Sequence, residues 1–238
     1  MKKSNLLIFT SVFMIVGSIT LVSCKKDTPP PAEAVVAAPV SKSLSENFDM
    51  VGDLGRSGWV LVNQSEPIGA RGWGQGKYTF GGKYGGDVIG FPAFSANNLP
   101  TDYACADLTA VNELGGINAW MITPTLEMKN GDMITFYSRS GGAVADRMQV
   151  RANLTDNSVN TGGGVEGIGK FTTLLLDINP TLTTAYPTTW TKYTITLSGI
   201  TGTVKGRIGF RYYIPSNAGN SGANGDIIGV DSFEFTSL

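Results

Sequence analysis

The sequence predicts an all-β fold, a two-sheet antiparallel jelly-roll β-sandwich with long glycine-rich loops, over residues 44–238. Two observations favour this fold class. Short segments alternate apolar and polar residues with a period of two, which is the pattern of strands that bury one face. Clusters of Gly, Asn, Asp and Ser separate these segments, and the chain contains 31 glycines. Short strands with long connections are more typical of a sandwich than of an up-and-down barrel.

The alternation is clearest in five segments, residues 133–138, 147–154, 192–197, 207–214 and 227–235. In residues 207–214, for example, Phe210 and Tyr212 share one face, whereas Arg211 and Tyr213 share the other. We find no convincing amphipathic helix after residue 43. The last of the five segments is expected to close the domain.

The N-terminus has the pattern of an export signal. Lys2 and Lys3 precede an almost uninterrupted apolar run over residues 6–22, as in a secretory signal peptide. The run ends at Leu21-Val22-Ser23-Cys24, which resembles a lipobox. We therefore predict a lipoprotein signal peptide over residues 1–23 and a lipid on Cys24. The alternative is a single transmembrane helix, because the run approaches the roughly 20 residues that span a bilayer.

Residues 24–43 are expected to form a lipidated, proline-rich tether. Pro29, Pro30 and Pro31 follow one another in a stretch rich in Ala and Val, which favours extended, semi-rigid conformations. The protein would then be exported and anchored to a membrane, at an outer membrane or cell surface. Lys25-Lys26-Asp27 loosely resembles the signal that sends lipoproteins of the Bacteroidetes group to the surface, and the leaflet stays open.

Composition excludes several classes of function. The chain has 18 basic and 19 acidic residues, so no nucleic-acid partner is expected. It has no histidine, which excludes Ser-His-Asp and Cys-His catalysis and the usual His-containing zinc sites. After lipidation of Cys24 only Cys105 remains, so no disulfide can form within the mature chain. We expect Cys105 to be buried rather than reactive.

Several short stretches, in a constant order across residues 44–238, together resemble the choice-of-anchor J domain and the related cleaved adhesin domain of gingipain-type proteins, and more distantly the MAM-like jelly rolls. The stretches are Glu46-Asn47-Phe48-Asp49, Gly58-Trp59, Gly72-Trp73, Asn118-Ala119-Trp120-Met121-Ile122-Thr123-Pro124, Ile134-Thr135-Phe136-Tyr137-Ser138, Asp146-Arg147-Met148-Gln149-Val150, Trp190-Thr191-Lys192-Tyr193, Arg207-Ile208-Gly209-Phe210-Arg211-Tyr212 and Ile228-Gly229-Val230-Asp231-Ser232-Phe233. The resemblance implies a jelly roll with a binding or adhesive role and an interchangeable attachment to the cell. It does not imply a defined reaction.

Carboxylates near both ends of the domain are candidates for a structural calcium site. The first and last strands of a jelly roll commonly lie side by side, which would bring Glu46 or Asp49 near Asp231. Such oxygen ligands suit Ca²⁺. The resemblance to cleaved adhesin domains implies the same ion, and Asn118 stands where that family usually has an aspartate, so it is a fourth candidate ligand. The alternative is that Asp49 and Asp231 are strand-end residues held by backbone N–H groups.

Aromatic residues suggest where a ligand could bind. Trp120 and Trp190 lie beside strand-like segments and are expected in the core. Trp73 lies in Gly72-Trp73-Gly74-Gln75-Gly76, a loop-like setting in which we expect it to be exposed and to contact a ligand. Arg211 and Tyr213, on the polar face of their strand, are further candidates.

These observations favour a binding or adhesion module without enzymatic activity. The expected ligand is a glycan or an extracellular protein, and structural calcium is the expected cofactor. An accessory envelope lipoprotein with a protein partner is one alternative. A carboxylate-dependent carbohydrate-active enzyme, with two acids flanking a cleft, is another.

Overall fold

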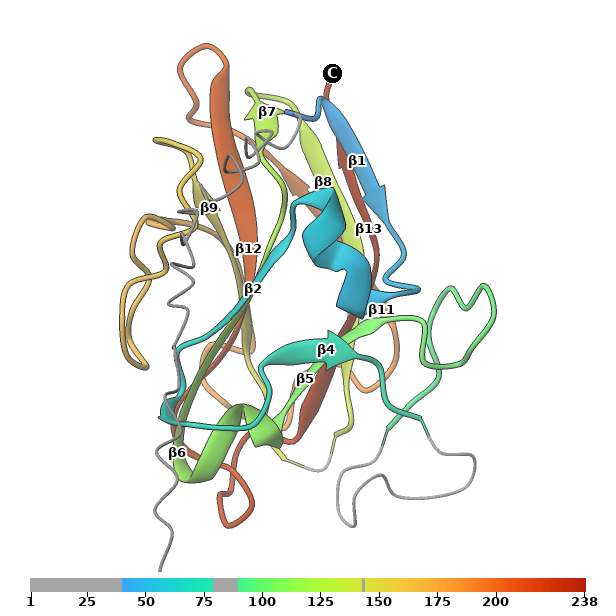
Figure 1. Ribbon diagram of the computed structural model, residues 1–238, viewed down its shortest axis with the longest axis vertical. Coiled ribbons are helices and arrows are strands. Elements are labelled where there is room, and N and C mark those ends of the chain that lie inside the picture. Colours follow the sequence, from blue (N-terminus) through green and yellow to red (C-terminus); the bar gives the residue numbers. More distant parts are fainter. Residues whose placement is uncertain (1–39, 79–89, 143) are drawn as a thin grey trace, which may run out of the picture. The chain divides into compact units, whose positions relative to one another are not determined.

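A computed structural model describes residues 40–78, 90–142 and 144–238, which belong to one compact unit (Figure 1). The predicted signal peptide, Cys24 and most of the predicted tether lie outside the described residues, so the predictions made for them stay predictions. Within the described part of the chain, no helix is long and apolar enough to cross a membrane.

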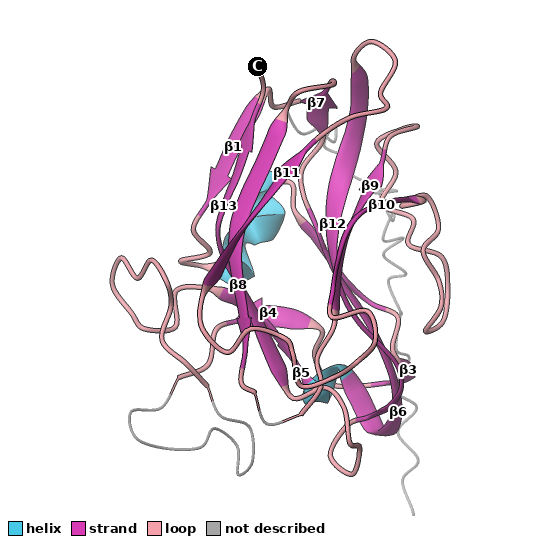
Figure 2. Ribbon diagram, turned by 180° about the vertical axis from the view of Figure 1, so that it is seen from behind, coloured by secondary structure: helices cyan, strands magenta, loops and turns pink. Residues whose placement is uncertain are grey.

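The described residues form two antiparallel sheets that pack face to face (Figures 1 and 2). In the first sheet the order is β11-β8-β13-β5-β4, and β1 also pairs with β13. Its strands are β1 (Ser43–Glu46), β4 (Trp73–Gln75), β5 (Ala104–Asp107), β8 (Met133–Ser140), β11 (Thr191–Thr196) and β13 (Ile227–Thr236).

In the second sheet the order is β10-β9-β12-β6-β2, with β3 paired to β6 and β7 paired to β12. Its strands are β2 (Val60–Asn63), β3 (Glu66–Ile68), β6 (Val111–Ile122), β7 (Leu126–Met128), β9 (Met148–Asn153), β10 (Thr173–Ile178) and β12 (Val204–Ala218). Two short 3₁₀ helices complete the described elements, η1 (Val51–Ser57) and η2 (Leu108–Ala110). The predicted two-sheet antiparallel sandwich is confirmed.

The start of the domain contacts both sheets. Glu46 of β1 lies opposite Phe233 of β13, so the predicted pairing of the first and last strands is confirmed. Just before β1, the Ser41 N–H donates to Thr125 O at 3.1 Å, and the Glu127 N–H donates to Ser41 O at 3.0 Å. These two hydrogen bonds attach the chain to the region of β7, in the second sheet.

Alternating apolar residues of both sheets meet in the main core. A series of aromatic rings crosses it, each in contact with the next at centroid distances of 5.0–5.7 Å. The rings are those of Phe48, Trp59, Phe233, Phe210 and Phe136. Edge-to-face contacts of this kind stabilise a core beyond the area that they bury.

Each sheet also buries part of its outer face under a loop. On the first sheet, Cys105 and Tyr103 pack with Phe91 of the loop over residues 91–102. On the second sheet, Trp120 packs with Phe171 of the loop over residues 154–172, at a ring distance of 5.2 Å. Cys105 is fully buried, as predicted. The two loops decide which outer-face residues solvent can reach.

The glycine-rich segment over residues 72–76, expected to be loop-like, contains a strand instead, and glycines also occur inside a second strand. Residues 73–75 form β4, and Gly115 lies within β6. A Cβ at Gly115 would lie 2.1 Å from Glu66 O, and one at Gly76, directly after β4, would lie 2.3 Å from the Tyr103 ring. These glycines therefore permit close packing of neighbouring segments, which a sequence does not distinguish from a flexible turn.

Candidate functional site

The candidate site lies on the outer face of the first sheet, where the loop over residues 91–102 meets β8, β11 and β13. Its buried anchor is Asp231, which is fully buried. Asp231 Oδ2 accepts the N–H groups of Phe94 at 2.9 Å and Ser95 at 3.0 Å, and Oδ1 accepts the Ser232 N–H at 2.6 Å. Burial raises the pKa of Asp231 to about 6, although these backbone N–H groups act in the opposite direction.

Asp49 is held by the same loop. Its Oδ2 accepts a hydrogen bond from Asn97 Nδ2 at 2.7 Å, two residues beyond Ser95. The other oxygen, Oδ1, is buried and has no hydrogen-bond partner among the described residues. Asp49 and Asp231 are thus connected through residues 94–97.

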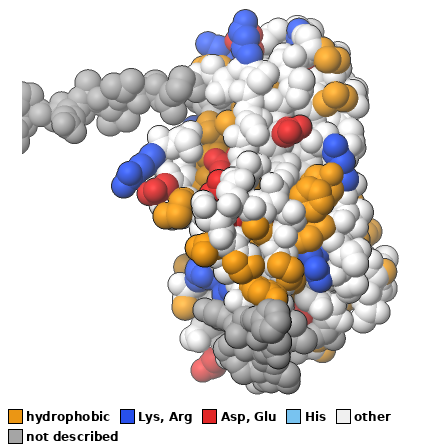
Figure 3. All heavy atoms as spheres, turned by 90° about the vertical axis from the view of Figure 1, so that its right-hand side faces the viewer, with side chains coloured by type: hydrophobic (Ala, Val, Ile, Leu, Met, Phe, Trp, Pro, Cys, Tyr) orange, Lys and Arg blue, Asp and Glu red, His pale blue; other side chains and the backbone are white. Residues whose placement is uncertain are grey.

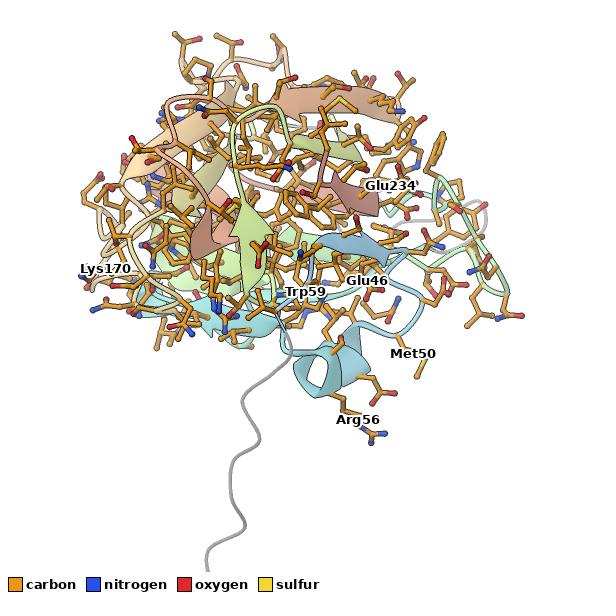
Figure 4. All side chains as sticks on the ribbon, turned by 90° about the horizontal axis from the view of Figure 1, so that it is seen from above. Glu46, Met50, Arg56, Trp59, Lys170 and Glu234 are labelled. Carbon is orange, nitrogen blue, oxygen red and sulfur yellow. The ribbon has the colours of Figure 1, made fainter. Side chains whose placement is uncertain are left out.

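Glu46 lies close to Asp49 and on the core side of β1. Its Oε1 accepts the Phe48 N–H at 2.9 Å. Burial raises the pKa of Glu46, and the nearby charge of Asp49 raises this pKa further. Figure 4 shows Glu46 on β1, next to the segment that leads through Met50 into η1. In the described parts of the chain, no group of three or more His, Cys, Asp or Glu side chains is placed to hold a metal ion.

Asn118 is not brought together with these carboxylates. It lies on β6 of the second sheet, where Ile117 and Ala119 face the main core and Asn118 therefore points to the opposite, outer face. Its Oδ1 accepts Arg211 Nε at 2.8 Å, and its Nδ2 donates to the Gly164 and Gly167 carbonyls. An oxygen that faces a guanidinium is a poor cation ligand, so we remove Asn118 from the predicted calcium set.

A stacked aromatic pair is the most exposed feature of the candidate site. The Phe94 ring lies on the Tyr137 ring with centroids 3.6 Å apart and an interplanar angle of 17°. Phe94 is 46% exposed, whereas Tyr137 is half-buried. Because the Phe94 N–H donates to Asp231, the buried carboxylate fixes the backbone that carries the exposed ring.

Cross-strand neighbours place charge beside this pair. Tyr137 of β8 lies opposite Lys192 of β11 on one side and Asp231 of β13 on the other. Lys192 is exposed, and its Nζ lies 5.9 Å from the centre of the Tyr137 ring. Figure 3 shows hydrophobic side chains gathered on this side of the molecule, with Lys and Arg side chains around them. The arrangement offers a flat apolar surface next to a cation.

The prediction that Trp73 is exposed is wrong. Trp73 is 4% exposed, belongs to the main core, and donates from Nε1 to Ala119 O at 3.1 Å. This bond joins β4 of the first sheet to β6 of the second. Trp59 and Trp120 are also buried, and Trp190 is half-buried with its Nε1 bonded to Pro92 O.

Arg211 and Tyr213 are also buried, which argues against their predicted contact with a ligand. They are 2% and 7% exposed, beneath the loop over residues 154–172. Tyr213 donates its hydroxyl to Glu166 Oε2 at 2.5 Å, and the Arg211 guanidinium lies 3.7 Å from the Tyr213 ring centre. Burial lowers the pKa of Arg211 to about 10; burial, followed by the bond to Glu166, raises the pKa of Tyr213 to about 12. Their contacts hold the loop to the sheet, on the side where Figure 4 places Lys170.

The sequence prediction missed Phe94 and Tyr137 as exposed partners. Tyr137 could have been found, because it lies between the inward-facing Phe136 and Ser138 of an alternating strand. Phe94 could not, because its segment has no period and its partner lies 43 positions later in the chain.

No family model and no curated protein matches this chain. Among solved structures, the K1 cleaved adhesin domain of Lys-gingipain from Porphyromonas gingivalis W83 is similar, with 17% identity and a TM-score of 0.49 over 83% of this chain and 99% of that one. The K3 domain of the same protein gives 16% identity and a TM-score of 0.49, over 82% and 98%. The C-terminal CBM6 of a marine laminarinase from Zobellia galactanivorans gives 11% and 0.35, again over 82% and 98%. The cleaved adhesin domains that the sequence resembles are thus among the structural matches, at low sequence identity.

Proposed function

We propose that this chain is an exported binding protein without enzymatic activity, held at an outer membrane or cell surface by a lipid on Cys24, whose candidate site binds a glycan. The observation that carries the proposal is the exposed Phe94 ring, stacked on Tyr137 beside Lys192. A solvent-exposed aromatic ring that is held against a sheet offers a flat apolar surface, which suits a ligand with a flat apolar face.

A sugar ring is such a ligand. The C–H groups on one face of a pyranose are apolar and weakly positive, so they pack on the electron-rich face of an aromatic ring. The Lys192 ammonium at the edge of the platform adds attraction for a carboxylate or sulfate on the glycan. We therefore favour acidic glycans over neutral ones, and expect their binding to weaken as salt concentration rises.

Replacement of Phe94 tests this proposal. A phenylalanine side chain buries about 200 Å² when fully covered, so the 46% exposed fraction offers about 90 Å² to a ligand. At about 25 cal/mol per Å² this contributes about 2 kcal/mol, or about a 30-fold change in affinity. The purified full-length protein in detergent, tested on an array of neutral and acidic glycans, should bind an acidic glycan. Phe94→Ala should weaken that binding by about 10- to 30-fold.

Leu99→Ala is the matched control, because Leu99 is 58% exposed on the same loop. It should leave binding unchanged. Equal losses for Phe94→Ala and Leu99→Ala would contradict the proposed platform, as would a wild-type protein that binds no glycan on the array.

We also propose a structural calcium ion beside Asp49 and Glu46. In support, Asp49 Oδ1 is buried without a partner among the described residues. Burial, with a smaller contribution from the charge of Asp49, raises the pKa of Glu46. A bound Ca²⁺ would neutralise both groups with oxygen ligands of the kind it prefers. Asp231 is not included, because backbone N–H groups occupy both of its oxygens.

The effect of calcium on thermal unfolding tests this second proposal. Calcium should raise the Tm of the wild-type protein, and Asp49→Asn should reduce that increase. Asp53→Asn is the control, since Asp53 is exposed and only pairs with Arg56 at 3.4 Å. A calcium response that Asp49→Asn leaves intact would contradict an ion at Asp49.

The lipid anchor is tested in cells of the source organism. Radiolabelled palmitate should enter the wild-type protein and not the Cys24→Ser variant, which should also leave the membrane fraction. Incorporation into Cys24→Ser would refute the predicted acylation site.

A further inference from the structure

The outer face of the first sheet carries a second exposed surface next to the candidate site, on β11, β8, β13 and β1 (Figure 2). Ile134, Phe136, Ile195 and Phe235 of these strands face the main core, so the residues that alternate with them point outward. The strand pairings arrange these outward residues in two rows. One row is Thr194, Thr135, Glu234 and Ser45, and the other is Thr196, Met133, Thr236 and Ser43. The two rows together are called the hydroxyl face below.

The hydroxyl face is open to solvent and partly hollowed. Its members are exposed, apart from the half-buried Thr135. All of them except Glu234 and Met133 are Ser or Thr, so the face consists mainly of short side chains. A depression of about 350 Å³ lies over β1 and β13 and is lined by Ser43, Ser45, Glu234 and Thr236, together with Leu44 and Phe235. Most of its lining therefore belongs to the hydroxyl face.

This face is continuous with the aromatic platform of Phe94 and Tyr137. Tyr137 and Thr135 lie two residues apart on the same side of β8, and Lys192 and Thr194 are related in the same way on β11. Two residues of a strand span about 7 Å, so the two rows extend the platform by about 14 Å. A single sugar ring on Phe94 would leave this surface empty, whereas a chain of linked sugars would reach it.

Short hydroxyl side chains suit the hydroxyl groups of a sugar. A Ser or Thr hydroxyl both donates and accepts hydrogen bonds, as a sugar hydroxyl does. Long side chains such as Lys, Arg, Glu and Gln lose the most conformational entropy when a ligand fixes them, and the hydroxyl face is poor in them. The carboxylate of Glu234 can accept sugar hydroxyls, and it repels a second carboxylate. The hydroxyl face therefore favours an uncharged sugar unit.

We propose that the hydroxyl face binds the continuation of the glycan whose acidic unit lies on the platform, so that the ligand is a linear chain with an uncharged unit next to the acidic one. This inference rests on the glycan binding proposed above and specifies its ligand class. Thr is also favoured on exposed strands for its backbone preference alone, and Val shares that preference. Exchange of Thr for Val therefore separates the two roles, because it removes only the hydroxyl group.

Binding as a function of glycan length tests the hydroxyl face. The probes are the disaccharide and the hexasaccharide of hyaluronan, in which glucuronate alternates with uncharged N-acetylglucosamine. In isothermal titration calorimetry, the purified full-length protein in detergent should bind the hexasaccharide at least about 10-fold more tightly, because further hydrogen bonds form. Thr135→Val combined with Thr194→Val should weaken hexasaccharide binding by about 10-fold and leave disaccharide binding unchanged.

Three further variants separate the parts of the surface. Thr172→Val is the matched control, since Thr172 is exposed next to β10 of the second sheet, and it should bind both probes as the wild type does. Phe94→Ala should weaken both probes by a similar factor, because both use the platform. Glu234→Gln should strengthen binding of hexagalacturonate, in which every unit is acidic, because it removes a repulsive charge.

Equal wild-type affinities for the two hyaluronan probes would overturn the hydroxyl face and leave the platform intact. An unchanged hexasaccharide affinity in the folded Thr135→Val, Thr194→Val protein would do the same. No gain for hexagalacturonate in Glu234→Gln would overturn the uncharged unit, and no binding of either hyaluronan probe would overturn the ligand class. If Phe94→Ala changes neither affinity, the platform fails and its extension fails with it. If the double variant does not fold, as judged by circular dichroism, Thr194→Val alone, on the edge strand β11, takes its place with the same refuting result.

Discussion

Arg211→Met should detach the loop over residues 154–172 from the second sheet. Arg211 donates to Asn118 Oδ1 at 2.8 Å, to Gln149 Oε1 at 3.0 Å and to Val165 O at 2.7 Å. Methionine fills a similar volume and supplies no donor. Gln149 Oε1 keeps a contact with Arg151 at 3.4 Å, so two acceptors, Asn118 Oδ1 and Val165 O, lose a strong donor.

The expected loss follows from these two acceptors. Each buried acceptor left unsatisfied costs about 1–3 kcal/mol, and removing the desolvated guanidinium returns part of this. We expect a net loss of about 2–4 kcal/mol in the free energy of unfolding. For a domain of this size, that corresponds to a fall in Tm of roughly 5–15 °C.

Urea and thermal unfolding measure the loss, and limited proteolysis locates it. Arg211→Met should be cut faster within residues 154–172, because the loop opens locally before the sheets unfold. Arg56→Met, at an exposed position, should change neither measurement. Unaltered stability and cleavage in Arg211→Met would refute the view that this buried arginine holds the loop.

Three further predictions concern other buried residues. Trp73→Phe should lower the free energy of unfolding by about 1–3 kcal/mol in urea titrations, because the hydrogen bond to Ala119 O and some core volume are lost. Its glycan affinity should be unchanged. A reduced affinity without a loss of stability would show that Trp73 contacts the ligand. The folded-state pKa of Asp231 is raised to about 6, so the folded state binds the proton of this carboxyl group more tightly than the unfolded state does. The free energy of unfolding should therefore decline by up to about 3 kcal/mol as pH rises from about 4 to 6. If Asp231→Asn shows the same decline in a pH series, the decline belongs to another group. Cys105, fully buried and with a pKa raised mainly by burial, should react with a thiol reagent only as fast as the protein unfolds; rapid labelling of the native protein would show that it is accessible.

Period-two alternation predicted the strands that have one face in the core and one face outside it. β8 is such a strand, and Ile134 and Phe136 face the core as expected. The alternation fails in β6, because residues on both of its faces are buried: Met121 in the main core and Trp120 beneath Phe171. Without an alternating pattern, a sequence cannot tell which way Asn118 points, and its predicted role depended on that direction.

The candidate site was predictable only where it follows from strand order. The first and last strands, β1 and β13, are paired as expected. This pairing brings Asp49 near the loop over residues 91–102, which is bonded to Asp231. The burial of Trp73 was not predictable, because Gly74 in its strand and Gly76 directly after it indicate a turn when the tight packing around them is unknown. The Phe94–Tyr137 stack depends on the path of a loop, which no local pattern encodes.

The hydrogen bonds at the start of the domain determine how it would respond to mechanical force. In the anchored protein proposed above, a load on the bound ligand is balanced by a pull on the chain just before Ser41. Ser41 is bonded to the region of β7, and β1, two residues later, is bonded to β13. Tension along the chain must therefore break contacts with both sheets before β1 is released. A domain attached in this way should unfold slowly under flow, because forced unfolding depends on the unfolding rate.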